Sequence, residues 1–215
     1  MPVLNSDPCR SASKIWSQLP PQNQDYHKEG QSALNDSVRI FLDEIIRYAT
    51  PSEEEAASVV AMAREVFSNT FAHLYDPAPF SRFLDEAYGP GGRMERDLAD
   101  PVIRWRIAAI GNQPIGYAKL SQLTAPAPAP LPGAMELQQI YVLRAWHGKG
   151  IADQLMEWAL DTALADGAPE IYLTVFDHNQ RAKRFYTRHG FAEVGHCTFQ
   201  LGDRVDDDRV WRKRL

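Results

Sequence analysis

The chain has 215 residues, of which 44% are hydrophobic, and a formal net charge of −5. This length and composition suffice for one domain with a sizeable core, and the acidic balance argues against a duplex nucleic-acid binder, which normally carries a basic stripe. No run of about 20 apolar residues and no signal-peptide pattern is present, so we expect a cytoplasmic protein with no membrane partner.

Charge and composition divide the chain unevenly. Residues 1–35 contain few apolar residues and four prolines, which predicts a flexible tail ahead of a single domain at 36–215. Residues 37–100 carry 12 acidic and 6 basic side chains, whereas residues 101–215 carry 12 and 14. This asymmetry suits a cationic substrate and an anionic cofactor held in different places, although a solvated acidic surface explains it equally well.

The first half of the domain is predicted to be mainly helical. A strand is expected through Ile45, Ile46 and Tyr48, followed by a helix. We expect Thr50 to cap that helix, Pro51 to occupy its first turn and Glu53 to complete a capping box. Apolar residues then recur at helical spacing, and further helices are expected in "PAPFSRFLDEAY" and "RMERDLAD".

From Pro101 the pattern becomes that of strands. "VIRWRIAAI" and "PIGYAKLSQL" predict a hairpin, and residues 125–133, "APAPAPLPG", predict a stiff loop without chemical content. Asp203 and Asp206 to Asp208 are interpreted as a polar turn before a last strand, "RVWRKRL". The remaining expected elements are a strand at 136–143, a helix at 151–166, a buried strand at 170–176, a helix at 179–189 and a strand in "FAEVGHCTFQL". This order predicts an α/β fold with a mixed sheet.

The segment "RAWHGKGIAD" joins a strand directly to a helix through two glycines. The amides of a helix start have no intrahelical acceptors and attract phosphate, and glycine lets the backbone approach it closely. The segment lacks the P-loop spacing and the third glycine of a dinucleotide fingerprint. Taken alone, it could equally be a turn that only reverses the chain.

A second segment, "NQRAKRFYTRHGF", follows at a fixed separation from "HGKGIA". Together they resemble the two signature elements of the GCN5-related N-acetyltransferase (GNAT) superfamily, with His147 at a position that usually holds Gln or Arg. The resemblance covers about residues 101–200. Including "EVFSNTFAHLYDPAPFSRFLDEAY" and the C-terminal residues, the chain looks most like the PaiA-type spermine/spermidine N-acetyltransferases. The resemblance implies a mixed, mostly antiparallel central sheet splayed between strands 4 and 5, with helices on both faces.

The resemblance also implies acetyl-CoA as cosubstrate and no metal. The pantetheine arm would pair with the backbone of the fourth strand, and the diphosphate would rest on the amides after it. Asn179 would bind the arm or cap its own helix. The residues implied to contact the cosubstrate are Ile140, Tyr141, Val142, His147, Gly148, Lys149, Gly150, Ile151, Ala152, Asn179 and Tyr186.

Amide formation from an amine and a thioester requires a base, an oxyanion donor and an acid for the thiolate. By resemblance, Glu136 is the expected base, acting through water, and the Val142 N–H is the oxyanion donor. Tyr186, two helical turns or about 10 Å from Asn179, is the expected acid. The alternatives are a solvated or salt-bridged carboxylate for Glu136 and a core tyrosine for Tyr186.

We therefore expect an N-acetyltransferase for a small cationic amine, with a polyamine first. Glu53, Glu54, Asp85 and Glu86 are acidic residues that could attract it. Another amine (an antibiotic, an amino acid or a protein lysine) and a CoA-binding regulator without catalysis are the alternatives. A homodimer is permitted by the apolar content of the last strands, and no nucleic acid partner is expected.

Overall fold

The computed structural model describes residues 46–215. The predicted tail at 1–35 and Ile45 lie outside the described residues. The first described element is β1 (Arg47–Ala49), which pairs with β2 and confirms the strand expected at Tyr48.

The first helical region begins two residues later than the sequence suggested. A 3-10 turn, η1 (Glu53–Glu55), leads into α2 (Ala56–Phe71), and the residue before η1 is Ser52, whose N–H donates to Glu55 Oε2 at 2.9 Å. The expected cap at Thr50 with Glu53 is therefore wrong. The capping pattern fits two registers, Thr50 with Glu53 and Ser52 with Glu55, and Glu55 is also the glutamate that pairs with Arg47 of β1.

Two further helices follow as expected. The short η2 (Ala72–Leu74) ends the first helical region, and α3 (Pro77–Tyr88) starts with a proline in its first turn. α4 (Arg93–Ala99) completes the group. No helix among residues 46–215 is both long enough and apolar enough to cross a membrane.

Seven strands form one sheet in the order β1-β2-β3-β4-β5-β7-β6. Only β4 and β5 run parallel; the other neighbours are antiparallel. The strands are β2 (Arg104–Ile110), β3 (Gln113–Gln122), β4 (Met135–Val142), β5 (Glu170–Phe176), β6 (Ala192–Leu201) and β7 (Arg204–Arg214).

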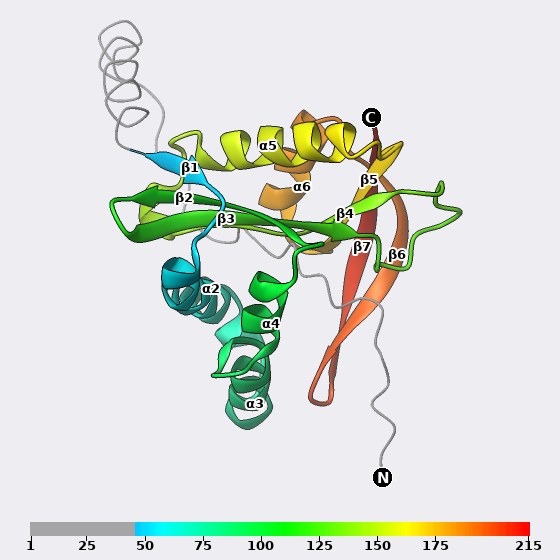
Figure 1. The fold of residues 1–215 in the computed structure, drawn as a ribbon. Helices are drawn as coiled ribbons and strands as arrows, with labels where there is room; N and C mark the ends of the chain where they lie inside the picture. Colours follow the sequence, from blue (N-terminus) through cyan, green and yellow to red (C-terminus); the bar gives the residue numbers. More distant parts are fainter. Residues whose placement is uncertain (1–45) are drawn as a thin grey trace, which may run out of the picture.

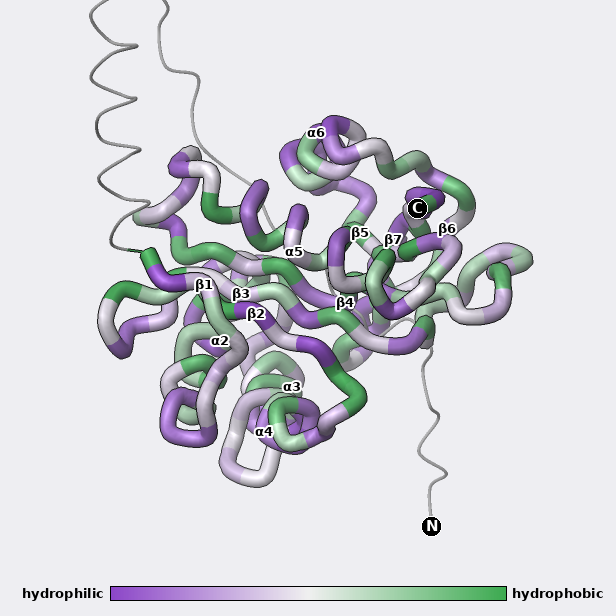
Figure 2. Tube along the Cα trace, turned by 45° about the horizontal axis from the view of Figure 1, so that its top comes forward, coloured by the Kyte–Doolittle hydropathy of each residue, from purple (hydrophilic) through white to green (hydrophobic). Residues whose placement is uncertain are grey.

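Helices cover both faces of this sheet (Figure 1). We call the face covered by α2, α3 and α4 the front face, and the face covered by α5 (Ile151–Ala165) and α6 (Gln180–Arg188) the back face. In Figure 2 hydrophobic and hydrophilic segments alternate along the helices, α6 included, as expected when each buries one side. The predicted mixed, mostly antiparallel sheet with helices on both faces is confirmed.

The parallel pair β4–β5 is held together at only one end. Met135 pairs with Ile171 and Glu136 with Tyr172, and no later residues of the two strands pair. On its other side β4 pairs with β3 along its whole length, with a bulge between Leu137 and Gln139. This confirms the expected divergence of strands 4 and 5, which we call the splay.

Most of the acidic segment before the C-terminus is strand: Asp203 lies in the turn between β6 and β7, as expected, whereas Asp206 to Asp208 belong to β7. β7 begins at Arg204, so Asp206 and Asp208 lie within the ladder, opposite Phe199 and Cys197 of β6. Both are almost fully buried, at 3% and 0% exposure. Asp206 accepts hydrogen bonds from Arg204 and from the phenol of Tyr75, and these bonds compensate its burial. The sequence around these aspartates could not reveal this contact, because Tyr75 lies 131 residues away in the chain.

Candidate active site

The glycine turn after β4 has the geometry of an anion site. Gly148 and Gly150 have φ of 76° and 81°, in the left-handed region that favours glycine. A Cβ at Gly148 would meet no atom within 4 Å, so the backbone conformation and not crowding by the protein requires glycine there. α5 begins at Ile151 with no side-chain cap, which leaves its first amides available to a ligand.

His147 joins this turn to the end of β4. Its Nε2 lies 2.9 Å from the Val142 carbonyl oxygen, and its Nδ1 lies 3.5 Å from Arg181 Nη1. Burial, followed by the nearby Arg181 and Arg144 charges, lowers the pKa of His147, although the bond to Val142 opposes this. His147 is therefore a neutral side chain that links the end of β4 to Arg181 of α6. Lys149 lies over the ring of Trp146, 4.8 Å from its centroid.

Three arginines that the sequence analysis did not single out face the turn. A cavity of about 410 Å³ is lined by the start of α5, by Val142 and by Arg181, Arg184 and Arg188 of α6. Arg188 is paired with Asp153 at 2.8 Å. Burial, followed by the nearby Arg184 charge, lowers the pKa of Arg181. Their spacing of three and four residues places them on one side of α6, and this helical period was the signal available in the sequence.

The open side of β4 carries the backbone groups expected to meet the cosubstrate. Ile140, Tyr141 and Val142 are buried, at 1%, 0% and 2% exposure. The Leu143 N–H donates to Ile115 of β3, and successive backbone groups of a strand point to opposite sides. The Val142 N–H therefore points toward the splay, where an oxyanion donor is required.

α6 places Asn179 and Tyr186 differently. Asn179 is the N-cap of α6, and its Oδ1 accepts a hydrogen bond from the Ala182 N–H at 3.1 Å. Of the two roles expected for Asn179, the structure therefore shows helix capping. Tyr186 is fully buried, with its ring 5.5 Å from Phe185 and 6.0 Å from Phe191. The aromatic packing expected of a core tyrosine is thus present, and its role as acid stays a prediction.

Glu136 is buried, and neither alternative considered for it is observed. It is 0% exposed and forms no ion pair with the described residues. Its Oε2 accepts from the Thr124 N–H and Oγ1 at 2.8 Å each, and from the Ala125 N–H at 2.9 Å. Its Oε1 is buried and has no hydrogen-bond partner in residues 46–215. One oxygen is therefore saturated and the other is available.

A cavity of about 340 Å³ lies on the front face, and its lining includes Thr124, which donates to Glu136. It is lined by Gln138 and Gln139 at the bulge of β4, by Lys119 of β3, and by aromatic and apolar residues of the front helices, among them Phe67, Phe83, Tyr88 and Met94. Cross-strand pairing of Ser121 with Glu136 and of Lys119 with Gln139 places Glu136 on the same face as Lys119.

Charged residues of both signs line the front cavity. Lys119 is buried and its Nζ lies 2.6 Å from Asp97 Oδ2; burial lowers its pKa, and the Asp97 and Glu136 charges act in the opposite direction. Arg93 and Asp100 also line the cavity. The cavity therefore offers both signs of charge together with an aromatic wall.

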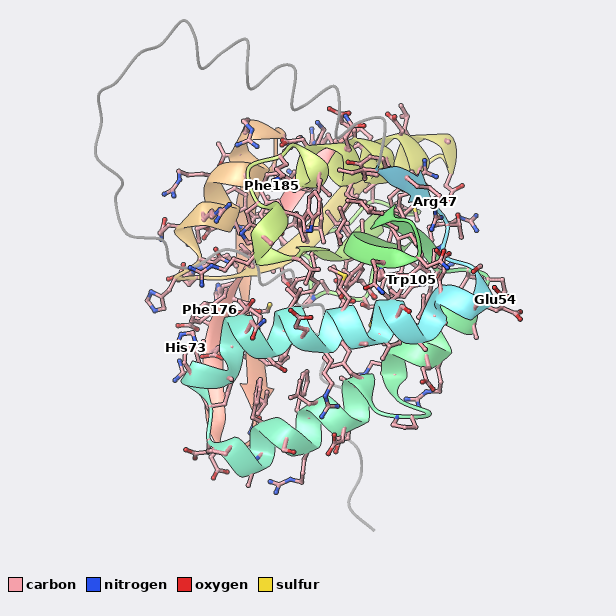
Figure 3. The ribbon with its side chains drawn as sticks, turned by 90° about the vertical axis from the view of Figure 1, so that its left-hand side faces the viewer. Arg47, Glu54, His73, Trp105, Phe176 and Phe185 are labelled. Atoms are coloured by element: carbon pink, nitrogen blue, oxygen red, sulfur yellow. The ribbon has the colours of Figure 1, made fainter. Side chains whose placement is uncertain are left out.

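The acidic residues expected to attract the acceptor do not line the front cavity. Figure 3 shows Glu54 at the opposite end of α2 from His73, which lies near Phe176 at the end of β5. Glu53 and Glu86 are exposed, and Asp85 is paired with Arg64 at 2.8 Å. Among the described residues, no group of three or more His, Cys, Asp or Glu side chains is arranged to hold a metal.

Comparison with known proteins identifies the family. The model of the acetyltransferase (GNAT) family matches residues 61–191. The chain belongs to this family. An N-acetyltransferase of Mycobacterium tuberculosis is 32% identical over 161 residues, 75% of this chain and 98% of the relative. An N-acetyltransferase of Lactobacillus delbrueckii is 25% identical over 170 residues, 79% of this chain and 98% of the relative.

A solved structure supports the same fold. The PaiA N-acetyltransferase of Thermoplasma acidophilum, crystallised with coenzyme A, superposes with a TM-score of 0.63 at 20% identity, covering 79% of this chain and 99% of the other. This GNAT protein is an acyltransferase, as its family and its named relatives show.

Proposed function

We propose that the protein transfers the acetyl group of acetyl-CoA to a primary amine of a small cationic acceptor, with a polyamine such as spermidine or spermine as the leading candidate. The observation that carries this proposal is the position of the splay. The cavity formed by the glycine turn and α6, which we call the anion cradle, lies behind its open end. In front of it lies a cavity lined in part by Thr124, which donates to the buried Glu136 carboxylate.

The residues of the cradle fit a nucleotide diphosphate. The first amides of α5 and the side chains of Arg181 and Arg184 supply donors and positive charge, and Val142 connects this cavity to the splay. Acetyl-CoA would supply the activated acetyl group as a thioester. The N–H groups of β4 that point toward the splay would hold its arm by backbone hydrogen bonds.

On the front face, Glu136 removes the proton of the attacking amine through its available Oε1, directly or by way of a water molecule. The Val142 N–H stabilises the oxygen of the tetrahedral intermediate, because it points toward the splay. Tyr186 donates its phenolic proton to the departing thiolate. The C–N bond forms in the tetrahedral intermediate, and the C–S bond breaks as this intermediate collapses. For the neutral amine, the proton that Glu136 takes from nitrogen balances the one that Tyr186 gives to sulfur, and an acceptor that arrives as an ammonium ion releases one further proton to solvent.

The front cavity and the resemblance to PaiA-type enzymes both support a polyamine. Phe67, Phe83 and Met94 can pack against its methylene chain, and Asp100 supplies a negative charge. Arg93 and Lys119 line the same cavity and favour a second candidate, an amine that also carries an anionic group, such as an amino acid.

A thiol-release assay with acetyl-CoA separates these candidates. We expect CoA release with spermidine and spermine and much less with amino acids, a lysine peptide or an aminoglycoside. If CoA is released only with another amine, a polyamine is not the acceptor, but the assignment as an acetyltransferase stands. Binding of CoA by calorimetry without release for any amine would indicate a regulator instead.

A further inference from the structure

The stretch at residues 125–133, which the sequence analysis considered free of chemistry, belongs to a longer loop that is attached at both ends to buried carboxylates. This proline loop, residues 123–134, connects β3 to β4. Near its start Thr124 and Ala125 donate to Glu136, and near its end the Leu131 N–H donates to Glu170 Oε1 at 2.9 Å. Glu136 and Glu170 belong to neighbouring strands at the paired end of β4 and β5. Both carboxylates are almost fully buried.

Thr124 contacts Glu136 with two donors at once. Its N–H and its Oγ1 both lie 2.8 Å from Oε2, and its Oγ1 in turn lies 3.3 Å from Nε2 of Gln138. Because the Gln138 amide donates to the hydroxyl oxygen, the hydroxyl hydrogen is left to point at the carboxylate. The hydrogen-bond chain from Gln138 through Thr124 to Glu136 therefore has a defined direction.

This arrangement selects one oxygen of the carboxylate. With the Ala125 N–H, Oε2 accepts three hydrogen bonds, which is more than its roughly two lone-pair positions. Oε1 is the oxygen left for a further proton, and Thr124 and Gln138 both line the front cavity. The start of the proline loop thus fixes which oxygen is presented and in what orientation.

We propose that Thr124 is a positioning residue of the transfer reaction: it holds the Glu136 carboxylate so that Oε1 receives the proton of the acceptor amine. This inference rests on the proposed role of Glu136 as base. It assigns a function to the proline loop beyond closing the chain between two strands.

The test compares Thr124→Val, which keeps the shape and the N–H but removes the hydroxyl, with Thr124→Ser, which restores the hydroxyl. We expect Thr124→Val to lower kcat about tenfold while the KM for the amine changes less than twofold. The acid limb of the pH profile of kcat/KM should move to higher pH, because a carboxylate that loses a donor holds a proton more readily. Thr124→Ser should recover most of both properties.

Tyr172→Phe is the matched control, because it removes a 2.8 Å hydrogen bond to Glu170 and so weakens the other attachment of the loop. Tyr172→Phe should lower the melting temperature about as much as Thr124→Val does, but it should not shift the pH profile of kcat/KM. Equal effects of Thr124→Val and Tyr172→Phe on kcat, or an unmoved acid limb in Thr124→Val, would overturn the inference.

Glu136→Gln separates this inference from the proposed function. If Glu136→Gln retains full turnover, Glu136 is not the base, and the positioning role of Thr124 is refuted as well. A large loss in Glu136→Gln together with a wild-type profile in Thr124→Val refutes the positioning role alone.

Discussion

The two faces of the sheet build their sites from different parts of the chain. The back site comes mainly from one short loop, the first turn of α5 and one side of α6, and much of it is backbone. The front cavity collects side chains from α2, α3, α4, β3, the proline loop and β4. A backbone site depends on local conformation, whereas the front site depends on long-range packing. Variants can test whether the two sites function as separately as they are built.

The largest expected effect concerns the residue proposed to act between the two sites. Tyr186→Phe keeps the ring in its aromatic surroundings and removes the phenolic proton. We expect kcat to fall about a hundredfold, as is typical for loss of a general acid, with unchanged affinity for acetyl-CoA by calorimetry. Tyr172→Phe, which removes another buried phenol, should retain turnover. Wild-type kcat in Tyr186→Phe would make Tyr186 a core residue only.

A backbone variant tests the back site alone. Gly148→Ala forces a Cβ onto a residue at φ 76° and should weaken CoA binding about tenfold in calorimetry, because the turn must relax. Gly167→Ala, at φ 78° after the other end of α5 and equally free of close neighbours, provides the same strain as a control. The amine KM should be unaffected in both. A similar loss of CoA affinity in the two variants would attribute the effect to α5 stability.

A side-chain variant should have a smaller effect on the same site. Arg184→Ala removes a cation without a carboxylate partner in residues 46–215 and should weaken CoA binding about fivefold, with a shallower salt dependence. Arg188→Ala removes an arginine that Asp153 already neutralises, so a smaller change is expected. Equal losses would contradict the assignment of Arg184 to the ligand.

The smallest expected effect is a pH dependence at the bridge between the turn and β4. Because the pKa of His147 is lowered on folding, the unfolded chain binds its proton more readily. The contribution of neutral His147 to stability is therefore complete above about pH 6.5 and decreases as the pH falls below that value. Thermal unfolding between pH 5 and 8 should show a shallower loss in His147→Gln, whose amide can donate to Val142 without titrating. Parallel curves would exclude His147 as the group responsible.

The sequence predicted the fold and the position of the glycine turn better than the side chains that line either cavity, because it did not single out Arg181, Arg184 and Arg188 of α6. The glycines, the helix start and the splay depend on local pattern and on a family resemblance carried by contiguous residues. It missed Thr124, because its partner Glu136 is brought to it by strand pairing, and it misinterpreted Asp206 and Asp208, because their burial depends on the packing of remote elements. The Ser52 cap was missed for a different reason, since Thr50 with Glu53 and Ser52 with Glu55 fit the local capping pattern equally well.

The pairing of β4 with β5 at only two positions has a kinetic consequence. Under the proposed function the arm of the donor would lie between the two separating strands, so a donor held behind the sheet and an acceptor held in front of it need not exchange places. Under the proposed function both would be bound at the same time, and the acetyl group would move directly from sulfur to nitrogen without residing on the enzyme. Initial rates measured against both substrates would then give intersecting, and not parallel, double-reciprocal lines.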